Sequence, residues 1–422
     1  RGTRGSGGGA VNRCPCIAAG LLAALALLGA TAGKAVASEA RSLSLAASPL
    51  VDDEIDIVDF PGMITTYSDL VFLNIGPALG SLAGPPDQAS MTGSLGALFG
   101  REVALGLWIH RTPRFDDLAE TDRLFELEAP LPTTYHLADL FLGFGTGFGL
   151  RLGIAAGLES DDEFDEDGDP VSTGGSTFAA DLQLGYSFDS GQYHGDFGAG
   201  LQLSYFELLR RGDTTYDGGL VPSFLFRHRS IIGSRRDLAG VIDLVLTRRS
   251  YTAASRAEDG DLEQSGAFGR WLLDLSAGPR LRFPDIASFW LGLRFAFENL
   301  SGEIEKQEQP TLRGIVFPGL SAALEVTPLE VLAVRAGASY DITFAVSERP
   351  LPDDVDETDA EGLDAGARTM DRRFSWTTGL GLLLGDFRVD ATVSQGFYTA
   401  GPYLLSGNQS GFLGVISGSY AW

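Results

Sequence analysis

Four histidines are the residues of this chain best suited to acid–base chemistry near neutral pH. His110 and His136 flank a carboxylate-rich segment, and two imidazoles beside carboxylates could activate water or hold a metal ion. His194 and His228 fall in segments that we expect to lie too far away to join them. The sequence contains no phosphate-binding loop, nucleophile elbow or metal-binding repeat. We therefore predict neither an enzyme nor a cofactor, and we name no catalytic residue or metal ligand.

An acidic segment, residues 159–175, could bind divalent cations. Glu163, Asp165 and Asp167 fall at positions 1, 3 and 5 of an EF-hand-like loop. The glutamate that closes such a loop at position 12 is replaced by Gly174, and no helices are expected on either side. We therefore expect no EF-hand. Looser binding of divalent cations at acidic loops remains the alternative to a simply solvated surface.

The first 37 residues have the features of a Sec signal peptide. Basic residues precede a short apolar run, 17–28, and residues 35–37, Ala-Val-Ala, provide a small-residue cleavage site. The run is too short to span a membrane as a helix. Both cysteines, Cys14 and Cys16, lie in this leader, so the mature chain would have no disulfide and no cysteine-based metal site.

The chain is strongly acidic, with a formal net charge of −25. Loss of the leader, which carries four basic residues and no acidic ones, would lower the net charge to −29. A protein with this charge repels nucleic acid, so nucleic-acid binding is excluded. Two segments that we expect to be loops, 159–175 and 345–372, carry much of the negative charge.

Strict alternation of side-chain type is the strongest pattern in the sequence, and it indicates strands with two different faces. The pattern recurs from about residue 68 to the C-terminus, with no linker that would divide the chain into domains. Residues 147–158 give an example. One face there is Phe148, Leu150, Leu152 and Ile154, and the other face is Gly149, Arg151, Gly153 and Ala155.

These strands suit a membrane barrel better than a soluble sandwich. Aromatic residues gather at strand ends while aliphatic residues fill the middles, as in the girdles of transmembrane barrels. Each segment has the length of a tilted bilayer crossing, and no long apolar helix follows the leader. We therefore predict an all-β fold: a transmembrane, antiparallel, up-and-down β-barrel of sixteen strands over residues 68–422, or fourteen if the first segment and one other are not strands. The expected strands are 69–80, 88–99, 102–111, 135–145, 147–158, 176–188, 193–206, 219–229, 238–250, 268–283, 288–299, 314–326, 331–344, 373–384, 387–398 and 411–422.

Connections between the expected strands alternate between short and long. The short ones, such as 100–101 and 385–386, should face the periplasm, and the long ones should face outward. Both ends of the chain would then lie on the periplasmic side. His110 and His136 would lie at the outer rim, at the level of the lipid headgroups.

The C-terminus ends inside the last expected strand, with aromatic and apolar residues on one face. This ending resembles the signal that barrel-assembly machinery reads in its substrates. Over residues 68–422 the chain is similar to the porin-like class of Gram-negative outer-membrane β-barrels, although its last residue is Trp where the commonest form has Phe. Together with the leader, the resemblance implies Sec export to the outer membrane and contact with its lipid and lipopolysaccharide. Whether the protein forms a homo-oligomer is an open question at this point. The residues of the ending are Phe412, Ile416, Tyr420 and Trp422.

Sixteen strands enclose more space than their own side chains fill, which predicts an aqueous channel. Charged residues of both signs on the expected inner face support this interpretation, because ions are not stable in a dry core unless they are paired. Pairing of these charges to brace the wall is the alternative. The candidate pore-lining residues are Arg151, Asp181, Asp243, Asp274, Arg280, Arg282, Arg294, Glu298, Arg335, Asp341, Arg388 and Asp390.

The acidic residues of segment 159–175 suggest a selectivity loop. If this segment folds into the lumen, its carboxylates would make the pore prefer cations. Otherwise it is solvated outer surface. The candidate residues are Asp161, Asp162, Glu163, Asp165, Asp167 and Asp169.

Residues 38–67 form an acidic segment between the leader and the barrel. We expect a periplasmic lead-in, with a small plug inside the lumen as the alternative. A plugged barrel would resemble transporters of the fatty-acid class, but an ionic lumen argues against an apolar ligand. The predicted function is a porin-like channel for small polar solutes, with a preference for cations. The alternatives are a plugged substrate-specific transporter and a structural or adhesive barrel that acts through its acidic outer loops.

Overall fold

The structure is a computed structural model of the chain, and its description begins at residue 39. The leader and parts of several expected outer loops lie outside the described residues. The described ranges are 39–46, 48–67, 69–77, 91–111, 135–145, 147–164, 170–207, 210–211, 214–217, 220–233, 238–256, 262–283, 286–304, 311–348, 367–393 and 413–422.

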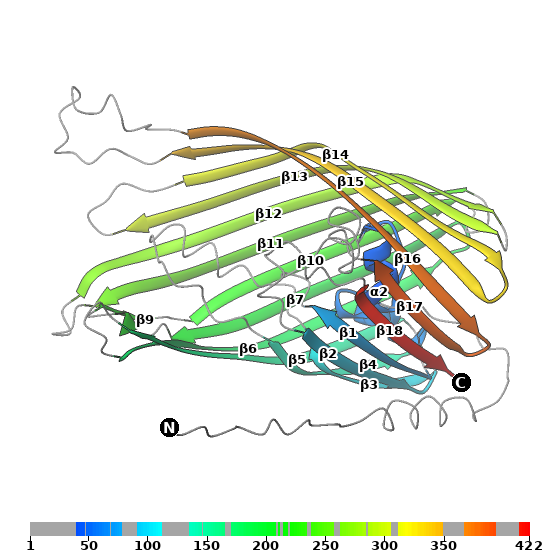
Figure 1. Ribbon diagram of the computed structural model, residues 1–422, viewed down its shortest axis with the longest axis horizontal. Helices are drawn as coiled ribbons and strands as arrows, with labels where there is room; N and C mark the ends of the chain where they lie inside the picture. Colours follow the sequence, from blue (N-terminus) through cyan, green and yellow to red (C-terminus); the bar gives the residue numbers. More distant parts are fainter. Residues whose placement is uncertain are drawn as a thin grey trace, which may run out of the picture.

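In the described part of the chain, eighteen strands form one antiparallel sheet that closes on itself (Figure 1). β1 (Leu70–Pro77) pairs with β2 (Met91–Phe99) on one side and with β18 (Leu413–Ala421) on the other, which closes the ring. β7 (Tyr193–Glu207) pairs directly with β10 (Leu220–Gly233), so the two short strands between them are additions at the rim. Sixteen strands therefore make the wall, which confirms the predicted up-and-down barrel.

The other wall strands follow in chain order, each antiparallel to its neighbours. The first expected segment, 69–80, does contain a wall strand, so the alternative of fourteen strands is wrong. The remaining bounds are β3 (Val103–Arg111), β4 (Tyr135–Phe144), β5 (Phe148–Phe164), β6 (Pro170–Asp189), β8 (Arg210–Arg211), β9 (Thr214–Asp217), β11 (Leu238–Arg256), β12 (Leu262–Phe283), β13 (Ala287–Ile304), β14 (Thr311–Leu329), β15 (Leu332–Glu348), β16 (Ala367–Leu384) and β17 (Phe387–Val393).

Several strands are longer than their alternation indicates. β5 and β6 stay paired out to Phe164 and Pro170, so the segment expected as loop 159–175 largely continues the hairpin. β12 reaches 22 residues. Antiparallel pairing uses backbone groups and needs no apolar face. The predicted strands therefore end where charged residues begin, whereas in the structure the backbone pairing continues beyond that point.

The two faces of the wall are inverted relative to those of a water-soluble protein. On β5 and β6, Leu152 and Leu182 are 47% and 42% exposed, whereas Arg151 and Asp181 are 2% and 6% exposed. Exposed Leu, Ile, Val and Phe side chains recur on the outer face of most wall strands. A continuous apolar surface of this kind is stable against hydrocarbon rather than water. No helix within the described ranges is long and apolar enough to cross a membrane.

Exposed aromatic residues mark the ends of the strands. Phe99, Phe283 and Trp422 lie beside the short turns, and the rings of Phe99 and Trp422 are 5.6 Å apart. Phe178 and Tyr205 form an exposed pair across β6 and β7, nearer to the long connections. These positions fit the two interfacial girdles of a transmembrane barrel.

Residues 39–67 lie inside the ring, and we call them the plug segment. It contains α2 (Glu39–Ser44) and two 3-10 helices, η1 (Glu54–Val58) and η2 (Pro61–Thr65). Figure 1 shows it in blue within the barrel, toward the end with the short turns. The structure thus differs from the expected periplasmic lead-in, because the acidic side chains of this segment meet arginines of the inner wall.

Glycines of the wall make room for the plug segment. A Cβ atom on Gly149 would lie 1.9 Å from the backbone oxygen of Pro61, and one on Gly198 would lie 1.8 Å from that of Asp59. Any side chain at these positions would displace the plug segment. The sequence shows that the residues at these inner positions are small. It does not show that a distant segment of the chain fills the space beside them.

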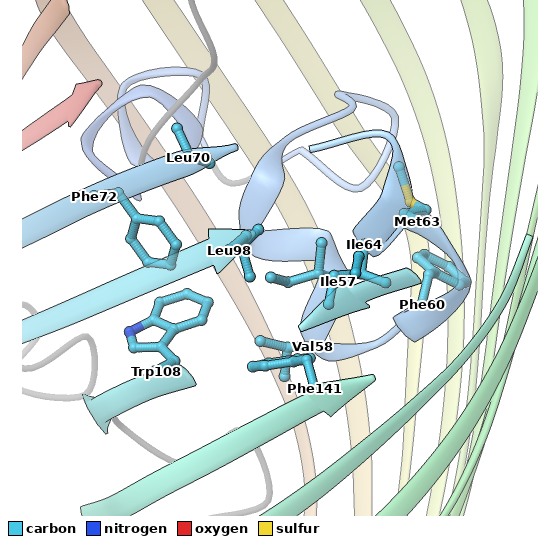
Figure 2. Packing of buried hydrophobic residues seen from close by; sticks show 11 residues of the cluster. Ile57, Val58, Phe60, Met63, Ile64, Leu70, Phe72, Leu98, Trp108 and Phe141 are labelled. Carbon is cyan, nitrogen blue, oxygen red and sulfur yellow. The ribbon is translucent and has the colours of Figure 1, made fainter. Parts of the chain in front are cut away.

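Two apolar clusters also hold the plug segment against the wall. In the first, shown in Figure 2, the rings of Phe72 and Trp108 meet edge-on at 4.7 Å. Part of the inner wall over β1 to β4 is therefore apolar, beside buried polar residues such as Asn74 and Asp139, which corrects the expectation of an ionic lumen. The first cluster comprises Ile57, Val58, Phe60, Met63, Ile64, Leu70, Phe72, Leu98, Ala104, Trp108 and Phe141, and the second comprises Leu45, Leu50, Val51, Ile231, Val241, Trp290 and Ala323.

Candidate functional site: the lumen and its plug segment

Three carboxylates of the plug segment pair with three arginines of the inner wall. Asp52 lies 2.9 Å from Arg280 of β12, and Asp56 lies 2.6 Å from Arg229 of β10. Asp59 pairs with Arg227, two positions before Arg229 on the same strand. Residues on alternate positions of a strand share a face, so β10 presents both guanidiniums to the lumen.

The same arginines are also bound to carboxylates of the wall. Arg229 donates to Asp196 of β7 at 3.1 Å, and Arg227 donates to Asp243 of β11 at 3.0 Å. The ring of Phe60 lies near both guanidinium carbons, at 5.1 Å from that of Arg227 and 4.9 Å from that of Arg229. Each guanidinium therefore joins a wall strand, its neighbour and the plug segment in one buried network.

A second contact is made through Arg41, at the end of α2. Its Nε atom donates to Glu325 of β14 at 2.9 Å, and its Nη1 atom donates to the backbone oxygen of Asp52 at 2.9 Å. Glu325 also accepts from Arg335 at 2.5 Å. Arg41 thus reaches both the wall and the η1 end of the plug segment.

The wall supports this contact with a chain of ion pairs. Arg335 lies 2.8 Å from Asp390, and Arg388 lies 2.7 Å from the same carboxylate. Two backbone amides of the plug segment also donate to hydroxyls of the wall: Ala40 to Ser417 at 3.0 Å, and Ala46 to Thr377 at 3.1 Å.

Electrostatics favour the ionised form of Asp52 in the docked plug segment. Burial alone would raise the pKa of Asp52, but Arg229 and Arg280 outweigh it and hold that pKa below its ordinary value. The carboxylate is therefore retained as an anion at neutral pH. The ion pairs contribute to docking only while both partners keep their charge.

Another ionic cluster lies on β3 to β6. Asp139 accepts hydrogen bonds from Arg111 at 2.9 and 3.3 Å, and Asp181 pairs with Arg151. His136 lies between the two carboxylates, with Nδ1 3.4 Å from Asp139 and Nε2 3.7 Å from Asp181. His136 therefore faces inward and is buried, and the expectation of a rim histidine at headgroup level is wrong at this position.

The donor set of this cluster has the composition of a metal site. Ligand atoms of His136, Asp139 and Asp181 lie within 4.8 Å of one another, and a Cβ on Gly153 would fill the space between the carboxylates. Arg111 and Arg151 already balance both carboxylates, however, so a divalent cation would add excess positive charge to a buried site. The arrangement fits an ionic brace of the wall better than a metal centre.

The predicted pore-lining residues divide into groups. Arg280, Arg335, Arg388, Asp390 and Asp243 belong to the network around the plug segment, and Arg151 and Asp181 belong to the brace on β3 to β6. A third group pairs within the wall alone, and Arg282 is exposed near the turn after β12. The pairs of the third group are Arg294 with Asp274 at 2.7 Å, Arg294 with Asp341 at 3.1 Å, and Glu298 with Arg270 at 2.6 Å.

The other predicted residues are placed only in part. Asp161, Asp162 and Glu163 lie on the extended end of β5, whereas Asp165, Asp167 and Asp169 lie outside the described residues. Ile416 and Trp422 are exposed on the outer face, Tyr420 is half-buried, and Phe412 lies outside the described residues.

Sequence reasoning missed the two central arginines, Arg227 and Arg229. Their spacing of two positions on one strand places them on the same face, and this could have indicated them in the sequence. However, the inner face of β10 also carries the buried apolar residues Val221 and Leu225. Apolar residues therefore occur on both faces of this strand, and alternation is weak. The apolar residues Phe72, Trp108 and Phe141 were missed because inner and outer apolar positions look alike in sequence.

No protein-family model matches the sequence, and no curated protein matches it. Among solved structures, the copper transporter OprC matches with a TM-score of 0.41 and 12% identity, over 77% of this chain and 45% of that one. The P. putida toluene transporter TodX matches with a TM-score of 0.41 and 10% identity, over 92% of this chain and 99% of that one.

The ferric citrate transporter FecA also matches, with a TM-score of 0.41 and 10% identity, over 77% of this chain and 59% of that one. The chain thus spans about half the length of OprC and FecA. At these scores the matches are no basis for assigning a substrate. The closed ladder and the exposed apolar belt themselves identify an outer-membrane β-barrel.

Proposed function

We propose that the protein is an outer-membrane channel for small polar solutes, and that the plug segment closes the lumen and moves to open it. The observation that carries the proposal is the set of buried and partly buried pairs between Asp52, Asp56 and Asp59 and the wall arginines. These pairs hold a segment of the chain inside a ring that would otherwise enclose water.

The type of contact supports movement of the plug segment. The described strand pairings involve no residue of the plug segment, and its polar contacts to the wall run through side chains or single backbone groups. A buried ion pair gains attraction but loses hydration, so its net contribution to docking is small. The two apolar clusters add to docking, but neither they nor the ion pairs belong to the strand ladder, so the segment can leave the wall while the ladder stays intact.

A preference for cations is part of the proposal. It rests on the strongly acidic chain and on acidic residues near the outer ends of β5 and β6. Reversal potentials in a salt gradient measure it directly. A preference for anions in the open wild-type channel would contradict the proposed cation selectivity but not the proposed closure by the plug segment.

One observation favours a second candidate, a transporter whose solute has an apolar part. Phe72, Trp108 and Phe141 line the inner wall beside the plug segment, and they would form an apolar surface if it moved. Uptake by liposomes distinguishes the two candidates. The channel should pass small sugars and ions without saturation, whereas the transporter should show saturable uptake of an amphipathic solute and little ionic current.

The central experiment tethers the plug segment to the wall. A Cβ atom on Gly337 would lie 2.9 Å from that of Ala46 and 2.4 Å from both the Ala46 nitrogen and the Leu45 carbonyl carbon, so the loop must move by about 1 Å to reach the Cβ separation of about 3.8 Å that a disulfide needs. Gly337→Cys alone should therefore displace the plug segment, whereas the disulfide should hold it near the wall. We expect the variant Ala46→Cys with Gly337→Cys, made with Cys14 and Cys16 replaced by Ser, to conduct only when reduced. Equal current in the oxidised and reduced forms would overturn the proposal. Each single cysteine variant is the control for the substitutions themselves.

A further inference from the structure

One carboxyl group of the plug segment is buried with no side chain of the described residues donating a hydrogen bond to it. Glu54, the first residue of η1, is 0% exposed, and neither of its oxygens has a hydrogen-bond partner among the described residues. An ionised carboxylate in such a position loses its hydration and gains nothing in return. A proton on Glu54 removes this cost.

Asp53 provides the acceptor for that proton. Its Oδ1 atom accepts from the backbone N–H of Glu54 at 2.9 Å and so caps η1. Its Oδ2 atom is buried, lies 3.5 Å from Nη1 of Arg41 and has no hydrogen-bond partner among the described residues. A protonated Glu54 would donate to Asp53, and the two side chains would then satisfy one another.

The charged groups around the pair do not neutralise both carboxyls. Arg41 of α2 lies 3.5 Å from Asp53 but donates to Glu325, and Arg388 of β17 is bound to Asp390. Asp56, on the same 3-10 helix, adds negative charge. Burial, with the charge of Asp53 added, raises the pKa of Glu54 well above its ordinary value.

We infer that Asp53 and Glu54 form a proton-sharing pair that keeps the plug segment docked while Glu54 is protonated and weakens docking when Glu54 ionises. The inference rests on the proposed function, since it specifies what regulates the proposed opening. The direction follows from linkage. A carboxyl whose pKa is raised in the docked state supports docking at low pH, and this support is lost as the pH rises through the raised pKa.

The test measures exposure of the plug segment separately from current. Ser48 is a buried residue of the plug segment, and Ser48→Cys, in a chain with Cys14 and Cys16 replaced by Ser, places one thiol there. The thiol should react with a maleimide only when the segment leaves the wall. The ratio of undocked to docked plug segment, and with it the labelling rate, should increase about tenfold per pH unit between the ordinary and the raised pKa of Glu54. The rate is compared with that of an exposed thiol at each pH.

Two variants decide the inference. Glu54→Gln should remove the increase of the labelling rate with pH and keep labelling slow at high pH, because the amide cannot ionise. Asp53→Asn keeps an N-cap residue and offers Glu54 a donor, so it should reduce the increase. Glu330→Gln, in the exposed turn between β14 and β15, is the matched control and should behave as the parent does.

The possible results are distinct. Labelling that does not vary with pH in the parent, or that still varies equally in Glu54→Gln, overturns the inference. Labelling that varies as expected while no condition gives a current supports the proton-sharing pair and rejects the proposed channel. Labelling and current that rise together support both.

Discussion

Arg229 and Asp56 connect the barrel wall to the plug segment through a contact of 2.6 Å in which the guanidinium is fully buried. Arg229 is also bound to Asp196 of the neighbouring strand. Removing the plug segment would therefore change the charge balance of the wall as well as the space inside it. Closure and selectivity of the proposed channel are coupled through the same residue.

Loss of Arg229 should release the plug segment. In Arg229→Met, Asp56 and Asp196 would remain buried without this partner, and breaking one side of a buried pair costs about 3–5 kcal/mol. We expect faster labelling at Ser48→Cys and a larger open fraction in single-channel records. Arg294→Met is the control, because Arg294 pairs with Asp274 and Asp341 of the wall. Equal labelling rates in the two variants would count against the role of Arg229.

Neutralising the plug carboxylates should shift selectivity toward anions. In the combined variant Asp52→Asn, Asp56→Asn and Asp59→Asn, the wall arginines lose their partners from the plug segment. The local wall then holds three arginines, 227, 229 and 280, against two carboxylates, Asp196 and Asp243. The reversal potential should move in the anion direction relative to the open wild-type channel. Adding Arg280→Gln should reverse part of that movement.

Docking should also weaken in acid, through Asp52. Since Arg229 and Arg280 lower the pKa of Asp52 against the effect of burial, the stabilisation is present above its ordinary pKa, about 4. It is lost as the pH falls through the lowered value. Labelling at Ser48→Cys should therefore rise again below about pH 4, and Asp52→Asn should remove this acid rise. An identical acid rise in both proteins would assign it to other groups.

A methyl group on Gly198 should displace the plug segment without opening the strand ladder. The added Cβ would lie 1.8 Å from the backbone oxygen of Asp59, which also accepts a hydrogen bond from Gln183 at 2.8 Å. Gly198→Ala should increase current and labelling, while circular dichroism keeps the strand signal. Gly314→Ala is matched to it, because a Cβ there meets its nearest atom only at 3.9 Å. Similar currents in the two variants would show that this close contact does not hold the channel shut.

The sequence by itself determined the barrel. Each residue of a strand points to one side or the other by its parity, so local alternation was enough to place Leu152 outside and Arg151 inside. The same local pattern predicted the number of wall strands. It underestimated their length, since backbone pairing continues where alternation stops, as at Phe164 and Pro170.

Only the tertiary structure decided what the inward residues meet. Asp52 and Arg280 are 228 positions apart, and Arg41 and Glu325 are 284 apart, so no local pattern relates them. Apolar residues such as Trp108 are buried on the inner face because the plug segment packs against them, although in sequence they look like the lipid-facing residues beside them. A side chain's orientation is set by its own strand, whereas its partner is set by the closure of the whole ring, which brings distant segments to the same place.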